Sequence, residues 1–144
     1  MSSEAGTELL REAIRQTLAF TAGATPDARA ASGATLTVWR QVAARLAPVI
    51  GQRGVAALFE RALHLTGRAF PWLEGKAAEG VTLEQVLESR LEARDARTAL
   101  EAGGVVLITF TGLLATLIGS SLSNRLLASI WRPVAERMEQ EKQP

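Results

Sequence analysis

Few residues in this chain of 144 could carry out acid–base, nucleophilic or metal chemistry. It has a single histidine, His64, and no cysteine. The chain therefore has no thiolate nucleophile and no disulfide, and a metal ion would have to be bound mainly by carboxylates. The acidic residues that share one predicted helix are Glu84, Glu88, Glu92 and Asp95. Arginines alternate with them, so this pattern indicates a solvated, ion-paired helix face and not a metal site.

Motifs of known catalytic sites are also missing from the sequence. There is no GxxxxGK[ST] phosphate loop, no GxGxxG and no GxSxG. Glu60 and His64 are four residues apart, whereas di-iron helical bundles use Glu-x-x-His pairs. A serine triad would have to recruit His64 without any supporting pattern. We therefore predict that the protein is not an enzyme and that it uses no cofactor or metal.

His64 permits one alternative, a phosphotransfer role on a helical bundle. Arg61 and Arg68 lie about one helical turn from it and could hold a phosphoryl group. In histidine phosphotransfer domains, Lys and Gly stand three and four residues after the histidine. Those positions are Gly67 and Arg68 here, so the register differs from that of the family. The simpler interpretation is a histidine on the flank of an amphipathic helix, and phosphotransfer is kept as an alternative.

Composition predicts a single all-α domain. Hydrophobic residues make up 47% of the chain and aromatic residues only 5%, while Ala, Leu, Glu and Arg are abundant. These residues favour helices over strands. The sixteen basic and fifteen acidic residues leave a formal net charge of +1, so no basic surface for nucleic acid is predicted. The charged N-terminal sequence lacks the apolar core of an export signal, and we expect a cytoplasmic protein.

Apolar periodicity and turn residues predict five to six helices in one compact bundle that spans residues 1–144. The predicted helices cover approximately residues 8–23, 36–50, 55–70, 83–102, 105–118 and 122–138. Residues 23–35 are small and polar, which predicts a flexible loop, and residues 139–144 are predicted to fray. Thr82 and Gln85 have the spacing of a capping box at the start of a helix.

No charged residue lies between Glu101 and Arg125, so this stretch is long enough to raise the question of a membrane span. Gly103-Gly104 and Gly119-Ser120-Ser121 interrupt its ends, leaving residues 105–118 as the strong helix. Its length of about 21 Å is shorter than the bilayer core of about 30 Å. We therefore predict a central helix surrounded by the others, with membrane insertion of 105–118 as an alternative.

Two segments of the sequence resemble each other. LAPVIGQRGVAALFERAL begins at Leu46 and LATLIGSSLSNRLLASIW begins at Leu114, and they align without a gap. Both have the form helix, LAxxIG, helix. This pattern predicts two similar αα-hairpins in which Gly51 and Gly119 end a helix with a left-handed backbone. The alternative is that two unrelated hairpins use the same favoured turn.

Apolar residues in excess of one small core predict a surface for a partner. The aromatic residues that could anchor such an interface are Trp39, Trp72, Trp131 and Phe70. Alternatively, each of them fills one end of the core. We predict a non-catalytic interaction or regulatory protein of the adaptor or assembly kind, acting through an apolar helical surface. A homodimer or another protein is the predicted partner.

Overall fold

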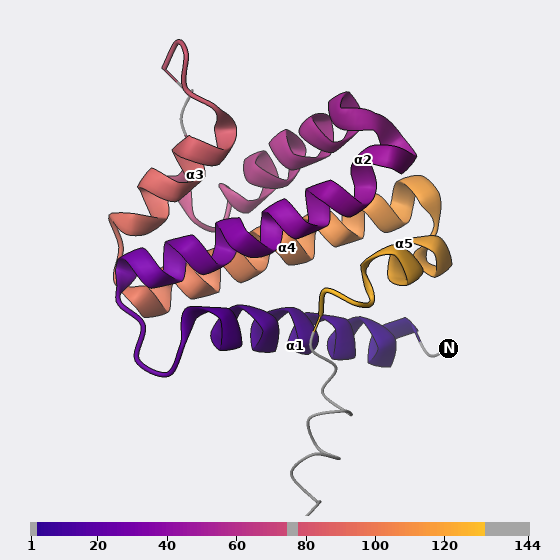
Figure 1. Cartoon of the computed structure of the whole chain (residues 1–144), viewed down its shortest axis with the longest axis horizontal. Coiled ribbons are helices and arrows are strands. Elements are labelled where there is room, and N and C mark those ends of the chain that lie inside the picture. The colour runs from indigo at the N-terminus through magenta and orange to yellow at the C-terminus, as the bar shows by residue number, and fades with distance from the viewer. Residues whose placement is uncertain (1–2, 75–77, 132–144) are drawn as a thin grey trace, which may run out of the picture.

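The computed structural model describes residues 3–74 and 78–131, and within them all regular secondary structure is helical (Figure 1). The helices are α1 (Ser3–Ala22), α2 (Ala28–Thr66), the short 3-10 helix η1 (Pro71–Leu73), α3 (Leu83–Glu92), α4 (Ala96–Ile118) and α5 (Ser120–Leu127). Helix α4 packs against all four other α-helices. The predicted compact bundle around a central apolar helix is therefore confirmed. The predicted tail at 139–144 lies outside the described residues.

The predicted flexible loop at residues 23–35 is wrong for most of its length, because α2 already begins at Ala28. Asp27 caps this helix, and its carboxylate accepts a hydrogen bond of 2.8 Å from the Ala30 amide. The small residues that suggested a loop are buried in a close helix contact instead. Ser32 is 1% exposed and its hydroxyl donates to the Glu88 carbonyl of α3 at 3.0 Å. Only residues 23–27 connect α1 to α2.

The predicted helix over 83–102 begins where expected but is not continuous, because α3 ends at Glu92 and α4 begins at Ala96. Asp95 therefore precedes the central helix and does not share a face with the glutamates of α3. Gly103 and Gly104 do not weaken the start of a helix as expected. Both are buried inside α4, where their missing side chains allow neighbouring helices to approach. The capping box is confirmed: the Gln85 amide donates to Thr82 Oγ1 at 3.1 Å, and the Thr82 amide donates to Gln85 Oε1 at 2.9 Å.

The two LAxxIG segments adopt the same backbone. Helix α2 is interrupted at Gly51, which has φ 81° and ψ 158°, and α4 ends at Gly119, which has φ 90° and ψ 149°. The positive φ confirms the need for glycine, but the extended ψ differs from the expected left-handed helical value. Pro48 lies inside α2, and the interruption follows it at Gly51.

The likeness extends over a three-helix unit. The shift along the sequence that carries Gly51 onto Gly119 also carries Asp27, which precedes α2, onto Asp95, which precedes α4. The first part of α2 and α4 lie side by side in Figure 1 and run in the same direction. Helix α1 precedes the first long helix as α3 precedes the second. The described chain thus consists of two similar units packed along their long helices.

The interruption at Gly51 gives a first stability prediction. Replacing Gly51 with alanine should lower the free energy of unfolding by about 1–3 kcal/mol, because this φ/ψ region is strained for any residue with a Cβ. Gly33 lies within α2 without a left-handed φ, and a Cβ at this position would meet no atom within 4 Å. Gly33→Ala should therefore stabilise the protein by up to about 1 kcal/mol. Urea unfolding of both variants checks the predicted opposite signs, and equal signs would contradict the backbone assignment.

Aromatic side chains fill the core beside this interruption. The rings of Trp39 and Phe59 stack with centroids 4.1 Å apart and an interplanar angle of 17°. Phe110 of α4 meets the Trp39 ring edge-on, with centroids 4.8 Å apart. All three residues are buried. They join both parts of α2 to the central helix, and Trp39 and Phe59 also form the base of the site described next.

Candidate binding cavity

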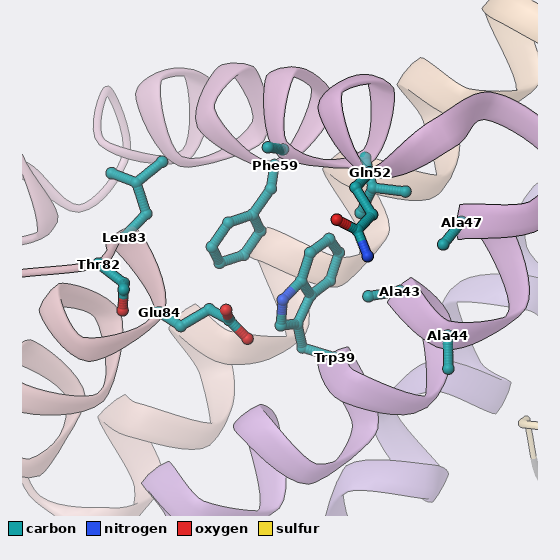
Figure 2. A pocket seen from close by; sticks show the side chains of 11 residues that line it. Trp39, Ala43, Ala44, Ala47, Gln52, Phe59, Thr82, Leu83 and Glu84 are labelled. Atoms are coloured by element: carbon teal, nitrogen blue, oxygen red, sulfur yellow. The ribbon is translucent and has the colours of Figure 1, made fainter.

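A cavity of about 440 Å³ lies in the bend of α2, beside the start of α3 (Figure 2). Its lining comprises Trp39, Ala43, Ala44 and Ala47 before the bend, Gln52, Val55, Ala56 and Phe59 after it, and Thr82, Leu83 and Glu84 from α3. The cavity exists because Gly51 turns the second part of α2 back over the first. The alanines leave space, and the stacked Trp39 and Phe59 rings form an apolar wall. Size and lining are those of a small-ligand site.

One polar group on this wall has no partner. The Trp39 side chain is only 3% exposed, and no described residue accepts a hydrogen bond from its indole Nε1. Thr66 Oγ1 is the one side-chain polar atom among the described residues that is both inaccessible to solvent and without a hydrogen-bond partner. The indole N–H of Trp39 is therefore not inaccessible, and a molecule in the cavity can reach it. Buried indole N–H groups usually have an acceptor. The cavity thus presents an unused donor at its apolar base.

The polar groups on the opposite side of the cavity come from the start of α3. Glu84 is half-buried in the first turn of α3, where the helix dipole favours a negative charge, and its side chain extends toward the Trp39 indole (Figure 2). The capping box between Thr82 and Gln85 fixes this turn. Gln52 adds an amide from the other side. Glu84 is the single charged residue among the described residues that line the cavity.

The aromatic residues predicted to form an interface differ in burial. Trp39 and Trp131 are buried, at 3% and 7% exposure. Phe70 and Trp72 are half-buried and meet edge-on, with centroids 5.9 Å apart. The Arg94 guanidinium lies 4.6 Å from the centre of the Trp72 ring, which holds this segment against the end of α3. The four residues therefore do not form one patch, and their interface role stays a prediction.

His64 is exposed near the end of α2 and is not among the residues that line the cavity. The phosphotransfer alternative stays a prediction. Among the described residues, no group of three or more His, Cys, Asp or Glu side chains is placed to hold a metal ion. The chemistry available in the cavity itself is therefore apolar contact together with hydrogen bonding by Trp39, Glu84 and Gln52.

The sequence identified Trp39 as a candidate binding residue, but it did not predict which other residues line the cavity with it. The partners Phe59 and Glu84 are far from it in sequence, and Glu84 looked like one member of a solvated charged face. The capping box was the available signal, because it places the first turn of α3 and hence Glu84. The repeated LAxxIG turn was the second signal, since a sharp turn between two helices creates a concave angle.

Two described helices are long and apolar enough to cross a membrane by length and composition, α2 and α4. In each of these helices an 18-residue stretch has high mean hydropathy, and 44% of this stretch is buried in the bundle in α4 but only 22% in α2. A buried core helix meets the same criterion, so membrane association stays a prediction. Comparison of the chain with protein-family models, with curated proteins and with solved structures finds no match.

Proposed function

We propose that this chain is a non-catalytic binding protein of the regulatory or adaptor kind, and that its ligand site is the cavity over Trp39 and Phe59. The observation that supports this most strongly is the indole N–H of Trp39, for which no described residue is an acceptor and which stays accessible at the apolar cavity. A ligand that supplies an acceptor can bind this N–H in place of water.

The arrangement of groups defines the class of ligand. The apolar walls take a ring system, the Trp39 N–H needs an acceptor, and the Glu84 carboxylate needs a donor. A neutral aromatic carboxamide carries an acceptor and a donor side by side on one ring. An anionic ligand is disfavoured, because the one charge on the lining is negative. We therefore assign the cavity to a small apolar ring with an amide-like group.

Calorimetric titration with 2-naphthamide tests this assignment, with naphthalene and 2-naphthoate as comparison probes. We expect saturable binding of the amide and weaker binding of the other two. Trp39→Phe should weaken binding of the amide about fivefold, the loss of one neutral hydrogen bond. Ala44→Leu should abolish it, because Ala44 is an exposed residue on the cavity lining and leucine fills the space.

The matched control is Arg45→Leu, which adds the same side chain at an exposed α2 position outside the lining. Arg45→Leu should bind 2-naphthamide as the unaltered protein does. Equal binding by Ala44→Leu and Arg45→Leu would place the ligand elsewhere and contradict the proposal. The same conclusion would follow from binding of naphthalene and 2-naphthamide with equal affinity, since the polar groups would then have no role.

The membrane-associated alternative has one supporting observation, the length and apolarity of α2 and α4. Light scattering after size exclusion, in buffer without detergent, separates it from the proposed binding protein. A discrete species that persists on dilution supports the bundle, and a mass of twice the 15.4 kDa chain would support the predicted homodimer. Material that becomes discrete only in detergent would favour insertion of 105–118.

A further inference from the structure

The internal repeat places a second cavity in the position equivalent to the first. This second cavity has a volume of about 460 Å³ and lies at the α4–α5 turn beside α1. The shift that carries Gly51 onto Gly119 carries lining residues of the first cavity onto lining residues of the second: Ala44 onto Gly112, Ala47 onto Ala115 and Val55 onto Ser123. Helix α1 takes the place that α3 has at the first cavity.

The charged residue that lines the second cavity has the opposite sign to the one that lines the first. The single charged residue among its described lining residues is Arg11, whereas Glu84 has this place in the first cavity. Polar groups stand where the first cavity is apolar, with Ser123 in place of Val55 and Asn124 in place of Ala56. The two cavities thus share a backbone frame and differ in the chemistry of their walls.

Ser123 gives this cavity a hydroxyl that has no partner among the described residues. It is 3% exposed, and no described residue makes a hydrogen bond with its hydroxyl, which is not sealed from the cavity. Helix α5 begins after Gly119, which has no side chain to cap the first-turn amides, and Ser120 of this turn also lines the cavity. Uncapped amides at a helix N-terminus favour an anion.

The Arg11 guanidinium has one carboxylate near it, that of Glu8 at 3.4 Å on the outer side of α1. Both side chains of this pair are about half exposed or more, so the pair is weak and leaves the guanidinium able to bind another anion. Glu8 does not line the cavity. The remaining wall is apolar and comes from Leu10, Ile14 and Ile108.

We propose that the second cavity binds a small amphipathic carboxylate. The carboxylate lies between Arg11, the Ser123 hydroxyl and the first turn of α5, and the alkyl chain lies on the apolar wall of α1 and α4. This site is independent of the proposed first site, because none of its lining residues belongs to that cavity. The protein then binds two ligands of different charge at two equivalent positions, each formed by the long helix and turn of one unit and the first helix of the other.

Calorimetric titration of the full chain with octanoate, kept below its micelle concentration, tests the proposal. We expect saturable binding of octanoate, and binding of octanol at least about tenfold weaker because it lacks the charge. Arg11→Gln and Ser123→Ala should each weaken octanoate binding, Arg11→Gln by about tenfold and Ser123→Ala by about fivefold. Arg15→Gln is the matched control, since Arg15 is an exposed α1 residue outside the lining, and it should bind as the unaltered protein does.

Gly112→Leu locates the binding site. A Cβ at Gly112 meets no atom within 4 Å, so the leucine enters the cavity without disturbing the fold and should abolish octanoate binding. Ala44→Leu, the equivalent change in the first cavity, should leave it intact. Octanoate binding that survives Gly112→Leu, or that Ala44→Leu removes, would overturn the proposal. Equal affinities for octanoate and octanol, or no octanoate binding at all, would overturn it as well.

Discussion

Gly103→Ala is expected to lower the free energy of unfolding by about 2 kcal/mol, the usual cost of overfilling a closely packed core. A Cβ at Gly103 would overlap the hydroxyl of Thr35 and would lie 3.0 Å from its Cγ2. Thr35 is 0% exposed and occupies the position in α2 that Gly103 has in α4, and the two long helices are in close contact here. Urea unfolding monitored by circular dichroism measures the change.

Two further variants make this prediction specific. Gly104→Ala adds the same group one residue further along, where the nearest atom is Leu18 Cδ1 at 3.7 Å, an ordinary contact. It should be neutral or slightly stabilising, because alanine is the better helix former. Combining Gly103→Ala with Thr35→Ala should recover part of the lost stability, since the overlap is removed. Equal effects of Gly103→Ala and Gly104→Ala would contradict the close approach at Thr35.

Phe110→Ala is expected to lower the free energy of unfolding by about 3–5 kcal/mol. The side chain is 0% exposed and packs edge-on against Trp39, so its removal leaves a cavity in the centre of the bundle. Leu117→Ala is the control on the same helix, because Leu117 is 60% exposed and should change stability by less than about 0.5 kcal/mol. Thermal and urea unfolding of both variants give the comparison.

A small effect of Phe110→Ala would contradict the position of α4 at the centre of the fold. The variant also reports on the first cavity, because Phe110 and Phe59 both pack against the Trp39 ring. Loss of this support should weaken the binding of 2-naphthamide even at temperatures where the variant stays folded. The Leu117→Ala protein should bind it normally.

The helices were predictable where apolar periodicity and a cap agree. The central helix at 105–118 follows from its uninterrupted apolar sequence, and the start of α3 follows from Thr82 and Gln85. The start of α2 was missed because Ala, Ser and Gly are typical of loops as well as of close helix contacts. Only the partner helix decides between these two roles, and Ser32 finds its acceptor at Glu88, far along the chain.

The sequence predicted the two turns of the repeat but not the similarity of α1 to α3 or the two cavities. LAxxIG identified Gly51 and Gly119, and both have the positive φ expected of a glycine turn. The likeness of α1 to α3 leaves little trace in the sequence, because each helix packs against different side chains. The cavities depend on residues from separate helices, such as Trp39 with Glu84 or Arg11 with Ser123, and sequence spacing does not predict that these come together.

The most direct test of the proposed function is the indole N–H resonance of Trp39 during titration with 2-naphthamide. The chain has three tryptophans, so a ¹H–¹⁵N correlation spectrum of the labelled protein contains three indole signals, which Trp39→Phe assigns. We predict that the Trp39 signal moves downfield to saturation, as a free N–H gains an acceptor, while those of Trp72 and Trp131 stay in place. A Trp39 signal that does not move, or that moves no more than the other two, would contradict the assignment of the cavity as the binding site.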